Sequence, residues 1–259
     1  MKDIQIKVPG KLFIAGEYAV VEKGQSAIIT AVDRFIYLRI QETRKPYGKI
    51  FSKDFTKKPA RWTRNRNRFW LDKQNYRLQY IRSAIHTTER YLYEQGVPLQ
   101  LFNLDIQSEL KSDRNKKLGL GSSGAITVGT IRALLQFYGL KDDDLLVFKL
   151  AVLTQMNLKM NSSFGDLAAA SHTGWIQYQN FDHNFVLKRF KKIPTSKLVH
   201  SNWPSLEIIK LSVSDQVNLI VGWTGSPASS NRLVGHVQNK KEQSKKEYQE
   251  FLKMSKKSV

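Results

Sequence analysis

Residues 119–124 of this sequence, Gly-Leu-Gly-Ser-Ser-Gly, are the stretch best suited to chemistry, and they run directly into an apolar segment. Glycines at the mouth of a helix let the backbone turn tightly and point successive N–H groups outward, where the helix N-terminus favours an anion. The hydroxyls of Ser122 and Ser123 could bond a phosphate oxygen or ligate Mg²⁺. A serine-capped helix with glycines for close packing explains the same residues, so the stretch alone leaves both interpretations open.

The sequence argues against several other kinds of catalytic site. The stretch lacks the Gly-Lys-Ser/Thr of a Walker loop, and no acidic residue ends a second strand at the spacing of a dinucleotide-binding site. The "HRD" and "DFG" motifs of protein kinases are absent from the sequence. The chain has no cysteine, and its five histidines are scattered without ligand spacing. These observations argue against a transition-metal enzyme.

Periodicity predicts an α+β chain whose sheet comes from both early and late segments. A buried helix is expected from Ser122 to Tyr138, a second over residues 76–96 with Gly96 just past its end, and a third opening at Asp142. Strands are expected at residues 4–8, 34–40, 101–106, 174–181, 185–190, 206–211 and 217–223.

The charge is strongly positive, with 42 basic against 22 acidic residues and a net charge of +20. Such a balance favours nucleic acid, anionic lipid or a highly phosphorylated small substrate. The densest basic segment, residues 53–73, interleaves Phe55, Trp62, Phe69 and Trp70 and could hold single-stranded nucleic acid. No known nucleic-acid motif accompanies it, so a solvated loop or β-excursion is the favoured interpretation.

The start of the sequence has no apolar core of the signal-peptide kind, and no apolar run is long enough to span a bilayer. We therefore expect a cytoplasmic protein with no membrane partner.

Two further stretches join the glycine–serine segment: "PGKLFIAGEYAVVEKG" at residues 9–24 and "NSSFGDLAAASHTG" at residues 161–174. Their order and separation resemble those of the GHMP kinases, which phosphorylate galactose, homoserine, mevalonate and phosphomevalonate. Within that superfamily the first stretch is similar to the phosphomevalonate kinases, because mevalonate kinases usually carry His where this chain has Tyr18. "VGWTGSPASSNRLV", at residues 221–234, is also similar to a segment of phosphomevalonate kinases.

The resemblance implies the GHMP kinase fold. It comprises an N-terminal ribosomal-protein-S5-domain-2-like α/β domain over residues 1–225, which binds nucleotide and substrate, and an incomplete ferredoxin-like domain that starts at residues 226–259. It also implies an ATP- and Mg²⁺-dependent phosphotransferase that converts 5-phosphomevalonate to 5-diphosphomevalonate in the mevalonate route to isoprenoids.

Site residues carry over by matched position. The loop around the ATP phosphates is implied to be Gly119, Leu120, Gly121, Ser122, Ser123 and Gly124, with Ser122 or Ser123 on Mg²⁺. Lys11 matches the lysine that neutralises charge near the transferred phosphoryl group, and Asp166 matches the aspartate beside the acceptor. The substrate-binding residues are implied to be Glu17, Tyr18, Ser226, Ser229 and Ser230. For the three serines, an ordinary strand-to-helix turn is an equally good interpretation.

A phosphomonoester acceptor changes the role expected of Asp166. Its second pKa is about 6, so the attacking oxygen is already ionised near pH 7 and needs no general base. Asp166 is then expected to position Lys11 or to repel misplaced acceptors.

The phosphomevalonate kinases that this chain resembles normally continue past the "GWTG" segment with most of a second domain and a third glycine-rich motif. A separate C-terminal half or a homo-oligomer is therefore a possible partner. The alternative function is an inactive or split GHMP-kinase fragment, or a basic nucleic-acid-associated relic of the fold.

Overall fold

The computed structural model describes residues 2–54, 56, 58–65, 68–72, 78–111, 116–160, 162–214, 216–225 and 244–259. Its strands are β1 (Asp3–Ala15), β2 (Ser26–Glu42), β3 (Gly48–Ser52), β4 (Ala60–Asn65), β5 (Arg68–Leu71), β6 (Phe102–Ser108), β7 (Trp175–Gln179) and β8 (Glu207–Leu211). Its helices are η1 (Ala19–Val21), α1 (Gln79–Glu94), α2 (Ser122–Phe137), α3 (Asp144–Asn157), α4 (Gly165–His172), α5 (His183–Arg189), α6 (Thr195–His200) and α8 (Lys245–Ser258).

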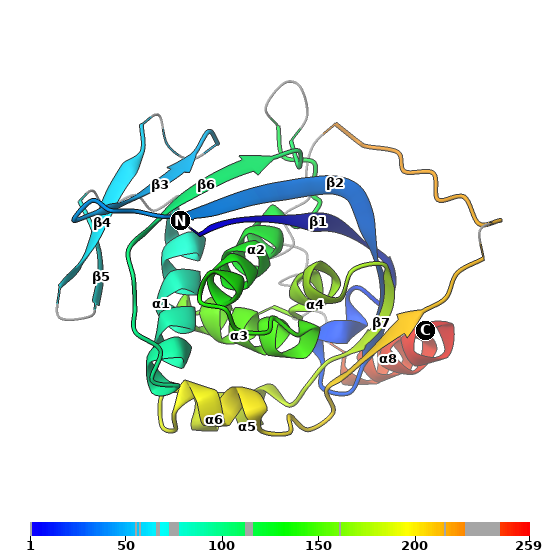
Figure 1. Cartoon of the computed structure of the whole chain (residues 1–259). Helices are drawn as coiled ribbons and strands as arrows, with labels where there is room; N and C mark the ends of the chain where they lie inside the picture. Colours follow the sequence, from blue (N-terminus) through cyan, green and yellow to red (C-terminus); the bar gives the residue numbers. More distant parts are fainter. Residues whose placement is uncertain are drawn as a thin grey trace.

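The strands form one mixed sheet in the order β5-β4-β3-β6-β2-β7-β8, with β1 paired to β2. Only the β3–β6 pairing is parallel among the described strands. Early and late segments therefore share one sheet, as the sequence predicts. Figure 1 shows the long strands β1, β2 and β6 arching over α1, α2, α3 and α4.

The long hairpin of β1 and β2 aligns the alternating apolar residues of both strands. Ile6 pairs with Leu38 and Val8 with Ile36, and all four side chains are buried. The register then shifts between Pro9 and Lys11. A bulge of this kind bends the strand and redirects the next side chain, so it decides where Lys11 points.

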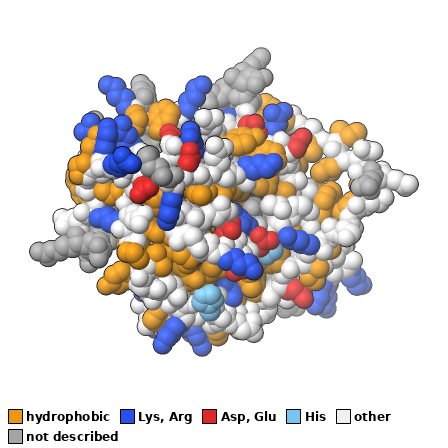
Figure 2. Space-filling model, in the orientation of Figure 1, with side chains coloured by type: hydrophobic (Ala, Val, Ile, Leu, Met, Phe, Trp, Pro, Cys, Tyr) orange, Lys and Arg blue, Asp and Glu red, His pale blue; other side chains and the backbone are white. Residues whose placement is uncertain are grey.

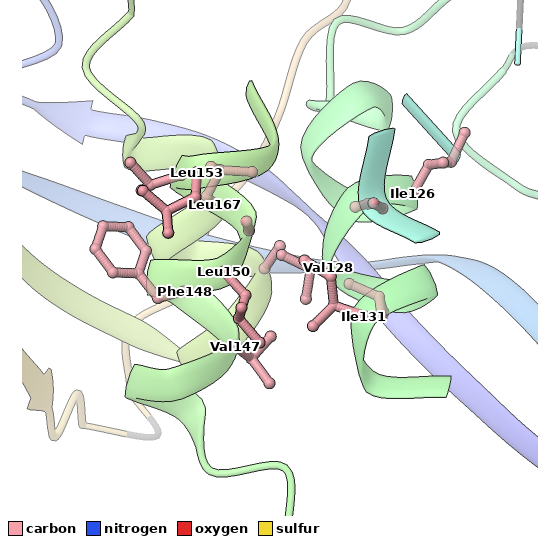
Figure 3. Close-up of a cluster of buried hydrophobic side chains, with 14 of the residues drawn as sticks. Ile126, Val128, Ile131, Val147, Phe148, Leu150, Leu153 and Leu167 are labelled. Carbon is pink, nitrogen blue, oxygen red and sulfur yellow. The ribbon is translucent and has the colours of Figure 1, made fainter. Parts of the chain in front are cut away.

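Helix α2 is buried on nearly every side, as its continuous apolar sequence predicts. In Figure 3 Val128 and Ile131 of α2 face Val147 and Leu150 of α3, and α4 contributes Leu167 to the same cluster. This cluster holds the N-terminal ends of α2 and α4 at fixed positions beneath the sheet.

Most of the expected elements are confirmed, with small shifts at their ends. Gly96 follows α1 with a φ of 73°, as expected for a helix C′ glycine. The third helix starts later than expected, because the cap is Asp143, whose side chain accepts hydrogen bonds from the N–H groups of Leu145 and Leu146.

The strand expected at residues 185–190 is wrong. Those residues lie mostly in helix α5, where the Asp182 side chain accepts a hydrogen bond from the Phe185 N–H group and caps the helix. The segment at 217–223 is not part of a strand among the described residues. Strand β3 was not anticipated; it pairs with β6.

The basic segment is a β-excursion over its described residues, with strands β4 and β5. Trp62 is 1% exposed, stacks on Phe69 with a centroid distance of 5.0 Å, and donates its ring N–H to the Phe102 carbonyl. This ring therefore serves the core and is closed to a nucleobase, whereas Trp70 is exposed and Phe55 lies outside the described residues. Figure 2 shows Lys and Arg side chains gathered over the part of the molecule where Figure 1 draws β3 and β4.

Helix α8 rests on the N-terminal part of the chain. Tyr248 is buried and donates its hydroxyl to Glu22 Oε1 at 3.0 Å, just after η1. Residues 226–243 lie outside the described residues, so the domain boundary at 225 stays a prediction. None of the helices in the described part of the chain is long and apolar enough to cross a membrane.

Candidate active site

The glycine–serine segment forms the N-terminus of α2. Gly119 and Gly121 have φ values of 83° and 74°, a region that glycine occupies without a Cβ clash, and Gly121 is the N-cap residue. Ser122 and Ser123 are the first helical residues and are half-buried. The first turn of a helix carries N–H groups without intrahelical partners, so this end suits a phosphate.

Lys11 flanks this helix end from strand β1. Its backbone N–H group donates to the Leu120 carbonyl at 3.0 Å, so strand and loop are tied together. A Cβ added at Gly121 would lie 3.0 Å from Lys11 Cγ, which shows how closely the lysine stem follows the loop. Burial lowers the pKa of Lys11, while the negative charges of Asp166 and Glu17 favour its protonated form.

Asp166 flanks the same helix end from the first turn of α4. A Cβ added at Gly124 would lie 2.6 Å from Asp166 Oδ2, so only glycine fits at this position. Burial raises the pKa of Asp166, and the positive charge of Lys11 opposes that rise. The structure therefore places Lys11, Asp166 and the N-terminus of α2 together, although they come from three distant parts of the sequence.

Glu17 and Tyr18 lie beyond the end of β1, beside this centre. Glu17 is exposed and contributes to the field at Lys11, while burial and a hydrogen bond to Glu17 raise the pKa of the Tyr18 phenol. Both residues line an open cavity of about 580 Å³ that α8 lines on its other side. Ser226, Ser229 and Ser230 lie outside the described residues, so their predicted role stays a prediction.

Two contributors to this region were not predicted from the sequence. Gly10 is one, because a Cβ there would lie 2.9 Å from the Leu120 carbonyl oxygen and would push strand and loop apart. The other is α8, which lines the cavity with Glu247, Glu250, Phe251 and Met254. Its mixed Lys and Glu residues are typical of a solvated helix face, although Tyr248 is buried in the structure.

Comparison with known proteins matches this arrangement to one family. A family model of the GHMP kinases N terminal domain matches residues 79–174, which include both helix ends at the site. A phosphomevalonate kinase of Streptomyces sp. (strain CL190) is 36% identical over 253 residues, covering 94% of this chain and 67% of the relative. The chain belongs to the phosphomevalonate kinase family.

Solved structures agree with that assignment. A protein of Listeria innocua superposes with a TM-score of 0.90 at 33% identity, over 99% of this chain and 70% of the other. The phosphomevalonate kinase of Streptococcus pneumoniae, solved in complex with phosphomevalonate and AMPPNP, superposes with a TM-score of 0.83 at 28% identity, over 98% of this chain and 71% of the other. The GHMP kinase fold expected from the motifs is thereby confirmed.

Proposed function

We propose that the chain transfers the γ-phosphoryl group of MgATP to phosphomevalonate and releases ADP and diphosphomevalonate. One observation carries the proposal: the side chains of Lys11 and Asp166 both lie against the N-terminus of α2, where a Cβ added at Gly121 or Gly124 would meet them. Two of the relatives named above, from Streptomyces sp. and Streptococcus pneumoniae, are phosphomevalonate kinases, and the second was solved with this acceptor and an ATP analogue.

The nucleotide half of the site is built from α2. Its N-terminal N–H groups and the half-buried Ser122 and Ser123 would receive the phosphates. Mg²⁺ prefers oxygen ligands and usually keeps several waters and substrate phosphates in its shell. The serine hydroxyls are donors of that kind at this helix end, so the residues present fit MgATP. The ion would neutralise charge on the phosphates.

The role of the acceptor half follows from the charges of the two reacting phosphates and of Lys11. An acceptor phosphate oxygen attacks the γ-phosphorus, a new P–O bond forms, and the bond between the γ-phosphorus and the bridging oxygen breaks to release ADP. The attacking oxygen is already ionised near neutral pH, since the second pKa of a phosphomonoester is about 6. Lys11 then compensates the approach of two anions, and Asp166 holds Lys11 in its protonated form beside the loop.

The cavity beside Glu17 and Tyr18 sets the orientation of the acceptor. It is lined by apolar side chains of β1 and α8, with the carboxylates of Glu17, Glu247 and Glu250 around them. Carboxylates repel a phosphate, so the phosphate end of the acceptor points toward Lys11. The acceptor contacts of Ser226, Ser229 and Ser230 stay a prediction, because these residues lie outside the described part of the chain.

Phosphorus NMR of the reaction mixture tests the proposal. Incubation with MgATP and phosphomevalonate is expected to give ADP together with a diphosphate ester, and no diphosphate ester without acceptor. Thermal stabilisation by MgATP is expected as well, because a ligand that binds only the folded state raises the melting temperature. Stabilisation by RNA or heparin without any effect of MgATP, and no ADP, would favour a nucleic-acid-associated relic.

A second experiment tests the part of the relatives that lies outside the region aligned with this chain. The matched part spans about two thirds of the Streptomyces relative. Supplying the remaining segment of that relative, in cis or in trans, would raise turnover if it contributes to the site as a partner. Size measurement of the same sample reports whether the chain self-associates.

A further inference from the structure

Helix α4 starts from a residue in a strained conformation. Phe164, its N-cap residue, has φ 60° and ψ 11°, in the left-handed region that a bulky side chain rarely occupies. Asp166 follows two residues later, in the first turn. The backbone at Phe164 therefore decides where α4 begins and where the Asp166 carboxylate points. Strain of this kind persists only where the surroundings hold it, and it concentrates at functional sites.

An aromatic cluster holds the Phe164 side chain. Phe164 is 1% exposed and stacks on Phe181 with a centroid distance of 5.7 Å and an interplanar angle of 22°. The His183 ring lies 5.2 Å from Phe164 and 4.5 Å from Phe181, measured between centroids. All the partners come from the segment just after strand β7.

A hydrogen-bond network from the end of β7 and the residues just after it holds the backbone. The Tyr178 hydroxyl lies 2.8 Å from the Ser163 carbonyl oxygen and 2.9 Å from Asn180 Oδ1, and donates its single proton between them. Tyr178 and Asn180 are both fully buried. His183 Nε2 lies 3.0 Å from the same Asn180 oxygen, which can only accept, so His183 donates there.

The side-chain NH2 group of Asn180 bonds the segment after β1 that carries Glu17 and Tyr18. Its Nδ2 group donates to the carbonyls of Val20 and Val21 at 2.7 and 3.3 Å. Those residues belong to η1, directly after Glu17 and Tyr18. The backbone of Asn180 is committed too, because its N–H donates to Gln25 and its carbonyl accepts from Gly24. Every hydrogen-bonding group of this buried side chain is thereby satisfied.

We propose that Tyr178 and Asn180 are positioning residues of the phosphotransfer site: together they fix the turn that aims Asp166 and hold the segment that carries Glu17 and Tyr18. The proposal rests on the proposed function, since it assigns these residues to the same reaction. Neither side chain touches substrate. They fix the distance between the segment of Glu17 and Tyr18 and the first turn of α4. A hydrogen-bonded network holds that distance more rigidly than two independent loops would.

Tyr178→Phe removes one hydroxyl and keeps the ring, and Tyr138→Phe is a matched control. The Tyr138 hydroxyl also bonds backbone, accepting from the Gln100 N–H at 2.9 Å and lying 3.1 Å from the Gln100 carbonyl oxygen. Tyr138 follows the C-terminal end of α2, at the opposite end from the glycine loop. Both variants lose tyrosine hydrogen bonds to the backbone, and the melting temperature should fall more in Tyr178→Phe, because the Tyr178 side chain is fully buried and that of Tyr138 is half-buried.

The kinetic constants separate positioning from a structural role. Because small displacements of a reacting geometry cost large factors in rate, Tyr178→Phe is expected to lower kcat roughly tenfold or more. The Kd for MgATP, measured by calorimetry, should stay within about twofold, because the α2 N-terminus is not part of this network. Tyr138→Phe should keep the kcat of the unchanged protein. Unchanged kcat in Tyr178→Phe, or an equal loss in both variants, would overturn the proposal.

Amide hydrogen exchange gives a readout that needs no kinase activity. Peptides covering residues 162–170 and 16–24 should exchange faster in Tyr178→Phe than in the unchanged protein, and not in Tyr138→Phe. Asn180→Asp should act on the same two peptides, because a carboxylate faces the Val20 and Val21 carbonyls. If the unchanged chain shows no phosphotransfer, the proposed function fails, and the exchange data alone decide the network: unaltered protection in both peptides would overturn it.

Discussion

Helices α2 and α4 both deliver their N-termini to the site, and both begin from a residue with positive φ. At α2 the residue is Gly121, with φ 74°; at α4 it is Phe164, with φ 60°. Glycine adopts this conformation without steric cost, whereas a residue with a Cβ is strained there by about 1–3 kcal/mol. One helix end is therefore encoded by its own residues. The other helix end is imposed by aromatic and hydrogen-bonding groups at the end of β7 and just after it.

The difference corresponds to the two halves of the proposed reaction. The nucleotide half uses backbone N–H groups and needs space, which glycines supply. The acceptor half uses side chains from β1, α4 and α8, and needs segments far apart in sequence to be held together. Substitutions at the two helix ends should therefore fail in different ways.

Lys11→Met should have the largest effect on the reaction, because Lys11 serves both halves. Loss of one charge contact to a transferring phosphoryl group lowers kcat by roughly a hundredfold or more. Lys7→Met, on the same strand and before the bulge, is the control, and it should leave kcat unchanged. Steady-state ADP release measures both. Comparable losses in the two variants would mean that general positive charge, and not the position of Lys11, is what matters.

Phe164→Gly tests the comparison itself. If φ strain alone limited α4, glycine would stabilise the protein; if the aromatic cluster dominates, loss of the ring outweighs the relief. We expect a net loss of about 2–4 kcal/mol in the free energy of unfolding, because deleting a buried phenylalanine ring costs about 3–5 kcal/mol and relief of strain returns part of it. Urea denaturation measures it. A stabilised variant would contradict the role given to the cluster.

Gly121→Val tests the nucleotide end, with Gly139→Val as its matched control. Both glycines have φ near 75°, but an added Cβ meets Lys11 at Gly121 and nothing within 4 Å at Gly139. Backbone strain of about 1–3 kcal/mol is expected in both variants. Only Gly121→Val should also weaken MgATP binding, roughly tenfold or more, since about 1.4 kcal/mol corresponds to a factor of ten. Calorimetry measures the MgATP affinity of both variants. Equal affinities would show that the loop is not part of the nucleotide site.

The smallest expected effect is a pH dependence of stability at the α4 end. Burial lowers the pKa of His183 below its ordinary value, despite the charges of Asp182 and Glu22, and burial lowers the pKa of His172 too. The folded state then binds fewer protons than the unfolded state just below pH 6.5, so stability falls as the pH falls through that range. Each histidine contributes at most about 1.4 kcal/mol per pH unit.

His183→Asn should reduce that slope and leave the part due to His172. Melting temperatures between pH 7.5 and pH 5 measure it. A slope identical to that of the unchanged protein would show that His183 is protonated equally in both states.

The comparison also explains what the sequence could predict. Glycines, serines and the apolar run after them mark the start of α2 locally, so the loop and helix were predictable with their residues. The resemblance predicted Lys11 and Asp166 as site residues. Their positions beside the helix end, however, depend on a register shift in β1 and on the turn at Phe164. Neither has a local signature, because a bulge and a strained phenylalanine are stabilised by contacts from distant residues.

The same reasoning accounts for the error at residues 185–190. A short apolar run suggests a strand there, yet Asp182 caps a helix and Val186 packs into the core from it. In a short segment, the capping residue and the tertiary contacts determine the secondary structure more than the hydrophobic pattern does. Likewise, the cover that α8 provides over the acceptor cavity depends on packing between the two ends of the chain.

The central claim is that this site joins two anions, and the specificity constant for the acceptor tests it most directly. Initial rates of ADP release should be measured with the unchanged chain and MgATP, with phosphomevalonate and with mevalonate varied in parallel. We predict a kcat/KM for phosphomevalonate at least a hundredfold above that for mevalonate, since a phosphate acceptor is already ionised and Lys11 faces it. Equal or greater kcat/KM for mevalonate would contradict the account.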